Sequence, residues 1–166
     1  MAGSETTSNS LSFSIMYLIR YPQVQRKIQQ EIDSLGKKPT ILDRYKLRYL
    51  EATIMEIMRH GNTSPIGVAH RAVKTTRLDE YIIPQDSIVL VNIWSIMRDA
   101  EHWGDPDVFR PERFIHSETG EVIYDETLIP FGMGKLRHWT TFILASYYLM
   151  LANSTSRFEI STSTEK

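Results

Sequence analysis

The segment "LRYLEATIMEIMR", residues 47–59, carries the strongest structural signal in the chain. Its apolar residues recur three and four positions apart, which predicts an amphipathic helix that ends at Gly61. Glu56 and Arg59 project from one face of that helix, and alone they would be typical of an exposed ion pair worth about 0.3–0.5 kcal/mol. A third charge would change this interpretation. Arg113, in the proline-bearing segment "FRPERF", is the candidate partner, because a rigid loop can fix a guanidinium against a carboxylate.

Outward from this segment, the sequence predicts a mainly α fold with a small antiparallel β sheet, an α+β class. Short β-branched runs separated by turn residues predict small strands within residues 66–91. Two prolines, a glycine and many charges at 98–114 predict a structured loop with neither helix nor strand. The predicted helices cover residues 2–20, 22–35, 47–60, 92–98 and about 140–152.

The composition limits the classes of function. The 166 residues, 42% of them hydrophobic and 23% charged, suffice for one domain with a core, and the net charge of -1 argues against a nucleic-acid partner. We expect a folded domain at 1–152 and a frayed Ser/Thr-rich tail at 153–166. Neither a signal peptide nor an apolar run of roughly 20 residues is present, so we expect no membrane anchor in this chain. The chain has no cysteine, which excludes disulfides and thiolate ligands.

Three further segments could bind or transform a ligand. At "AGSETT", residues 2–7, the simple interpretation is helix capping, and the functional one is that Glu5 and Thr6 organise water for proton delivery. Arg71 lies in a predicted strand, where it could face solvent or grip a carboxylate ligand. The glycines of "PFGMGKLRHW", residues 130–139, would let backbone amides point at an anion or at a metal-bound atom.

Taken in order, "AGSETT", the Glu56-x-x-Arg59 motif, "AHRA", "IPQDSIVLVNIWSIMRD", "WGDPDVFRPERF" and "PFGMGK" resemble successive landmarks of the cytochrome P-450 (haem-thiolate monooxygenase) family, nearest to its microsomal animal type. The resemblance runs from residue 2 to about 135. It implies a partial cytochrome P-450 fold, from the end of the central helix to the helix after the haem loop. It also implies haem as cofactor and the insertion of one oxygen atom from O2 into an organic substrate.

The same resemblance implies partners, a location and residue roles. The family acts on small hydrophobic substrates with a redox partner reductase at the endoplasmic reticulum membrane; without an anchor or signal, we expect this chain to be cytoplasmic if expressed as written. By position, Thr6 matches the proton-relay hydroxyl with Glu5 as its acid, and Arg71 matches a contact to a haem propionate. The remaining matches are the structural triad Glu56, Arg59 and Arg113, and the cofactor-loop residues Phe131 and Gly134.

The resemblance departs from the family pattern at the iron ligand. The family loop reads Phe-x-x-Gly-x-Arg-x-Cys-x-Gly, and its cysteine thiolate is the axial ligand of the iron. Ungapped pairing places His138 on the cysteine; a one-residue insertion restores Arg137 as the arginine but places Trp139 there. Either alignment removes the thiolate, so we expect a catalytically inactive chain.

The alternatives to a working enzyme are three: a decayed or truncated remnant of the family, a haem-binding module ligated by His138, and a partner-binding fragment. Family members have roughly three times this length, so we expect wide apolar faces at Leu11, Ile15 and Phe142, and with them poor solubility.

Overall fold

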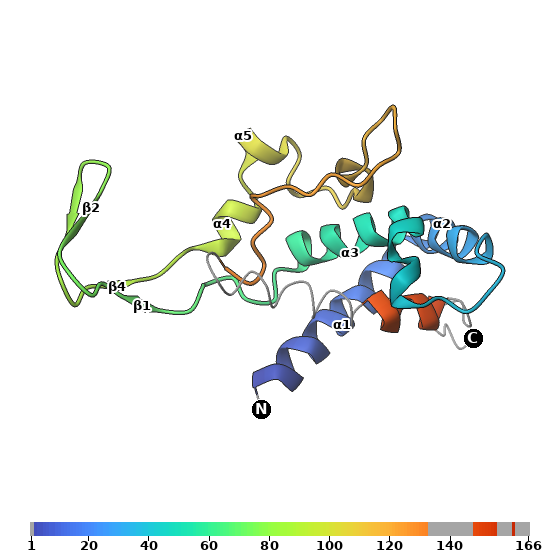
Figure 1. The fold of residues 1–166 in the computed structure, drawn as a ribbon, viewed down its shortest axis with the longest axis horizontal. Helices are drawn as coiled ribbons and strands as arrows, with labels where there is room; N and C mark the ends of the chain where they lie inside the picture. Colours follow the sequence, from blue (N-terminus) through green and yellow to red (C-terminus); the bar gives the residue numbers. More distant parts are fainter. Residues whose placement is uncertain (1, 133–147, 156–160, 162–166) are drawn as a thin grey trace.

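The structure, a computed structural model of the chain, describes residues 2–132, 148–155 and 161 (Figure 1). Long helices dominate it and the strands are short, which confirms the predicted α+β class. Residues 148–155 are also helical, three residues beyond the predicted end of the last helix. The elements in chain order are α1 (Ala2–Arg20), α2 (Pro22–Asp33), the 3-10 helix η1 (Ile41–Lys46), α3 (Arg48–Gly61), β1 (His70–Arg71), β2 (Thr76–Leu78), β3 (Tyr81–Ile83), β4 (Ile88–Val89), α4 (Ile93–Met97), α5 (Ala100–Trp103) and the 3-10 helix η2 (Pro111–Phe114).

Helix α3 is the centre of the molecule. Every residue from 51 to 59 is buried, so this helix is covered on all sides. Leu50, Ile54 and Ile57 on one side join the large core formed with α1, α2 and the helix at 148–155. Ala52 and Met55 on the other side pack with Trp103 and Phe114 of the segment that follows α4. The predicted exposed face of this helix is therefore absent, because a segment from much later in the chain covers it.

The start of α3 is stabilised by a side chain from another helix. Its own N-cap residue, Leu47, provides no side-chain acceptor. Instead the two carboxylate oxygens of Glu31, from α2, accept the backbone N–H groups of Tyr49 at 2.8 Å and Leu50 at 2.9 Å. These are two of the donors that an α-helix leaves unpaired at its start. Burial nevertheless raises the pKa of Glu31 above its usual value, because it outweighs these hydrogen bonds.

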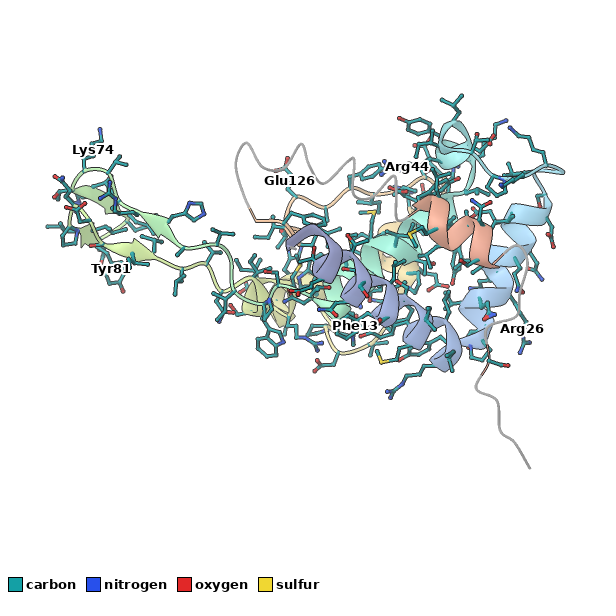
Figure 2. All side chains as sticks on the ribbon, turned by 90° about the horizontal axis from the view of Figure 1, so that it is seen from below. Phe13, Arg26, Arg44, Lys74, Tyr81 and Glu126 are labelled. Atoms are coloured by element: carbon teal, nitrogen blue, oxygen red, sulfur yellow. The ribbon has the colours of Figure 1, made fainter. Side chains whose placement is uncertain are left out.

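Residues 66–92 form a β arm that extends away from the helices (Figure 1). β1 pairs with β4 and β2 pairs with β3, both antiparallel, and the bridge between Ile66 and Asn92 closes the base of the arm. Figure 2 shows Lys74 and Tyr81 at the far end of this arm, distant from Phe13 on α1. The antiparallel arrangement agrees with the prediction, but β2 lies outside the β-branched runs that predicted the strands.

The segment at 98–114 corrects one prediction. It contains α5 and η2, whereas its prolines, glycine and charges predicted neither helix nor strand. Several of these residues stand at the ends of the short helices, where they are tolerated: Asp99 caps α5 by accepting the N–H of Glu101, and Gly104 ends it at φ 72°. Pro111 begins η2, where a missing N–H costs nothing.

Within the described ranges, no helix has the length and apolar character needed to cross a bilayer.

Candidate functional site

A buried charge cluster joins α3 to the segment that follows α4. Glu56 and Arg59 both have 0% exposed side chains. Arg59 donates from Nε to Glu56 Oε2 at 2.8 Å and from Nη2 to Glu56 Oε1 at 3.0 Å, a bidentate pair. Bidentate guanidinium–carboxylate pairs combine charge with fixed geometry. The interpretation of Glu56 and Arg59 as an exposed surface ion pair is therefore wrong, because the helix face that carries them is covered.

Arg59 also holds two backbone carbonyls that lie far from it in sequence. Its Nη1 donates to Met97 O at 2.7 Å and its Nη2 donates to Pro106 O at 2.8 Å. Its guanidinium lies 5.2 Å from the centre of the Trp103 ring, within the range of a cation–π contact. The positive charge is thus paired, hydrogen-bonded and shielded from water, as a buried charge requires.

Arg113 is the third charge of the cluster. Its Nε donates to Glu56 Oε1 at 3.1 Å, and its Nη1 and Nη2 donate to the carbonyls of Trp103 at 2.9 Å and Val108 at 3.0 Å. The backbone N–H of Arg110 donates to the same Glu56 oxygen at 2.9 Å. The structure therefore brings Glu56, Arg59 and Arg113 together, and we call them the buried triad. Its hydrogen bonds hold the surrounding loop against α3.

A mostly apolar cavity of about 250 Å³ lies where α1, the base of the β arm and the segment after residue 129 meet. One of its walls is held by backbone bonds, from Gly67 N to Val91 O at 2.9 Å and from Trp94 N to Pro65 O at 2.9 Å. The cavity is lined by Thr6, Ser64, Gly67, Val68, His70, Val91, Ile93, Pro130, Phe131 and Gly132.

Helix α4 connects this cavity to the buried triad. Its first residue, Ile93, is buried and lines the cavity, and its last residue, Met97, offers its carbonyl to Arg59. The helix has only five residues, little more than one turn. The buried triad at one end of α4 therefore helps to hold the cavity wall at its other end. Chemically, the arrangement is a mostly apolar cavity suited to an apolar part of a ligand, with Thr6 among the residues that line it.

The other predicted site residues divide into three groups. Thr6 and Phe131 line the cavity together. Glu5 is exposed in the first turn of α1 and does not line it, and Arg71 pairs with Asp86 at 3.3 Å on the exposed β arm. Gly134, Arg137 and His138 lie outside the described residues, as does Phe142.

Sequence reasoning missed several residues of this site. His70, next to the predicted Arg71, is the one that lines the cavity. Trp103 stacks on Arg59 and accepts from Arg113 through its carbonyl. Only the position of Trp103 at the start of "WGDPDVFRPERF" could have indicated it; nothing in the sequence separates His70 from its neighbour. The described residues contain no group of three His, Cys, Asp or Glu side chains that could hold a metal ion.

Comparison with known proteins identifies the family. The family model described as Cytochrome P450 matches residues 1–136. Cytochrome P450 1A1 of Microgadus tomcod is 42% identical over 141 residues, which are 82% of this chain and 27% of that protein. Cytochrome P450 1A2 of Felis catus is 40% identical over 141 residues, with 82% and 28% covered. The chain thus spans about a quarter of the length of the curated relatives it matches. With a family match over most of its residues and relatives of this identity, the chain belongs to the cytochrome P450 family.

Proposed function

We propose that these residues provide the structural base and one wall of the cofactor pocket of a P450 monooxygenase, and that the chain as given does not catalyse the reaction. One observation carries the structural half of this proposal. The buried triad holds α4, and α4 lines the same cavity as Thr6 and Phe131. A rigid support behind a pocket wall is what precise placement of a ligand requires.

The activity of the whole protein is proposed from the family. A P450 monooxygenase inserts one oxygen atom from O2 into an organic substrate, and its haem supplies the iron that activates oxygen. We propose a small hydrophobic substrate, a reductase as redox partner and the endoplasmic reticulum membrane as location for the longer proteins. We place most of the segments that select the substrate in the remaining part of those chains, since this chain spans 27% of such a relative.

The residues present fit haem only in part. The apolar cavity wall suits an apolar group such as the face of a macrocycle, and Phe131 is among the residues that line it. The donor set does not fit a haem-thiolate centre, because the chain has no cysteine. The side chain of Arg71 pairs with Asp86, is 71% exposed and does not line the cavity. We therefore derive no oxygen chemistry for this chain, and the proton-relay role of Glu5 and Thr6 stays a prediction.

The test is a titration of the purified chain with haem. Binding is monitored through the Soret absorption band of the haem in its ferric, ferrous and carbon-monoxide forms. We expect the unchanged chain to show no thiolate-type band and no turnover with a reductase and NADPH. The variants His138→Cys and Trp139→Cys restore a thiol in the two possible alignments of the loop, and one of them should gain a thiolate-type band. His116→Cys places a thiol on an exposed loop and is the matched control.

Each half of the proposal can fail separately. Turnover by the unchanged chain would contradict its inactivity. If neither His138→Cys nor Trp139→Cys differs from His116→Cys, the cavity is not the wall of a haem pocket. His138→Ala completes the set, since a saturable histidine-type spectrum that this variant abolishes would replace our proposal with the His138-ligated module.

A further inference from the structure

His60, the residue after the buried triad's Arg59, links three parts of the chain through its two ring nitrogens. The hydroxyl of Tyr17, on α1, lies 2.7 Å from His60 Nδ1, and the carbonyl oxygen of Asp107 lies 3.0 Å from His60 Nε2. A carbonyl only accepts, so Nε2 carries the proton that is donated to Asp107. In the neutral ring Nδ1 is then an acceptor, and Tyr17 donates to it. For the neutral ring, the two hydrogen bonds together therefore specify the Nε2–H tautomer.

An aromatic cluster holds the ring in this position. Tyr17 stacks on Phe109 with 4.6 Å between ring centres and 6° between planes, and Tyr21 also stacks on Phe109, with 4.8 Å between ring centres. The imidazole meets Tyr17 and Phe109 edge-on, at 5.4 and 6.1 Å. Such contacts restrict rotation of the ring, so it cannot easily exchange one hydrogen bond for another.

The charges around His60 oppose its protonation. Arg98, after α4, donates to the carbonyl of His60 at 3.1 Å and also pairs with the exposed carboxylate of Asp107. Arg59 adds a second nearby cation, and Glu56 is the nearby carboxylate on α3. Burial is the largest cause that lowers the pKa of His60; the bond to Asp107 opposes it, Arg98 and Arg59 lower the pKa further, and Glu56 raises it.

From this geometry we infer that His60 is a pH-sensitive junction that couples α1 to the loop at Asp107, closed while the ring is neutral and loosened when it is protonated. A protonated ring carries N–H on both nitrogens, so Nδ1 no longer accepts from Tyr17. The bond can then form only in reverse, from Nδ1–H to the hydroxyl oxygen, and the hydroxyl proton must turn away from the ring and leave its present partner. The junction extends the buried triad, because Arg59 holds the carbonyl of Pro106 and His60 holds that of Asp107. It requires no cofactor and so stands independently of the proposed function.

The pH dependence has a defined sign. In the unfolded chain His60 titrates near its ordinary pKa of about 6.5. Since the folded pKa is lower, the unfolded state takes up the proton first as pH falls. The stability that the neutral ring contributes is complete above about pH 6.5, declines as pH falls toward the folded pKa, and is lost below it.

The experiment compares urea midpoints from pH 8 to pH 5 for the unchanged chain, His60→Gln and the control His116→Gln. Glutamine also offers an acceptor and a donor group at the end of its side chain, but it does not titrate. We expect a smaller fall in midpoint for His60→Gln than for the unchanged chain, with His116→Gln following the unchanged chain. At pH 8, Tyr17→Phe and His60→Leu should together lower the midpoint by less than the sum of their separate effects. Parallel profiles for His60→Gln and the unchanged chain, or additive effects of the second pair, would overturn the proposal.

A second measurement uses only the unchanged chain, so it still tests the proposal if the variants do not fold. The ring-proton resonance of His60 is followed by NMR from pH 8 to pH 4, in buffer and in denaturing urea. We expect a lower titration midpoint in buffer than in urea. Equal midpoints in the two solvents would refute the junction.

Discussion

Two arginine–carboxylate pairs of this chain have the same chemistry and opposite surroundings. Arg59 and Glu56, on α3, are both 0% exposed and meet at 2.8 Å. Arg71 and Asp86, on the β arm, are 71% and 63% exposed and meet at 3.3 Å. A buried pair that loses one partner leaves an uncompensated charge, whereas water replaces the partner at the surface. The stability lost when one partner of such a pair is removed thus depends on how deeply the pair is buried.

The largest expected effect comes from removing one partner of the buried pair. Arg59→Ala removes the partner of Glu56 and the donors to Met97 and Pro106, so we expect a loss of about 3–5 kcal/mol in unfolding free energy. The matched variant Arg71→Ala should cost less than about 1 kcal/mol. Urea denaturation followed by tryptophan fluorescence measures both. Similar losses for the two variants would show that burial does not set the difference.

A second pair of variants extends the comparison to apolar side chains. Leu50 is 0% exposed in the main core and Ile82 is 68% exposed on the β arm. Leu50→Ala leaves a cavity and should lower the unfolding free energy by about 2–5 kcal/mol. Ile82→Ala removes a solvated side chain and should change it by about 0.5 kcal/mol or less. A loss of several kcal/mol at Ile82 would mean that the arm is packed against another surface in solution.

The smallest expected effect comes from Glu31, a third charged group, whose carboxylate is partly buried at the start of α3. Burial raises the pKa of Glu31, so its charged form is less favoured in the folded chain than in the unfolded one. Stability from this group is complete below its unfolded pKa of about 4.3 and is lost as pH rises through the folded pKa. We therefore expect the unchanged chain to lose stability relative to Glu31→Gln between pH 4 and pH 7. The check is the urea midpoint of both at each pH; a constant difference contradicts the raised pKa.

Exposed apolar side chains lie on the β arm as well as on one of the predicted faces. Ile15 is 46% exposed on α1, as expected, but Leu11 packs against the main core. The largest exposures among the apolar side chains of the arm are those of Val68, Val73, Tyr81 and Ile88, from 73% to 78%. Strands this short, with open edges on both pairs, are poorly protected against association with other chains.

Local sequence determined the parts of this protein that depend on neighbours in the chain. Apolar periodicity located α1 and α3, Tyr21-Pro22 separated α1 from α2, and the ordered motifs indicated the family that comparison then showed. These features depend on 3.6-residue spacing, on a missing N–H or on residue identity, all of which can be read without a fold.

Only the tertiary structure decided what those elements do. Whether Glu56 and Arg59 form a surface pair or a buried triad depends on residues 97–113, which lie about 40 to 60 positions later in the chain. The same holds for the Thr6 and Phe131 cavity and for the bonds from His60 to Tyr17 and Asp107. Burial, desolvation and hydrogen-bond partners are set by which distant segments pack together, and local spacing does not contain that information.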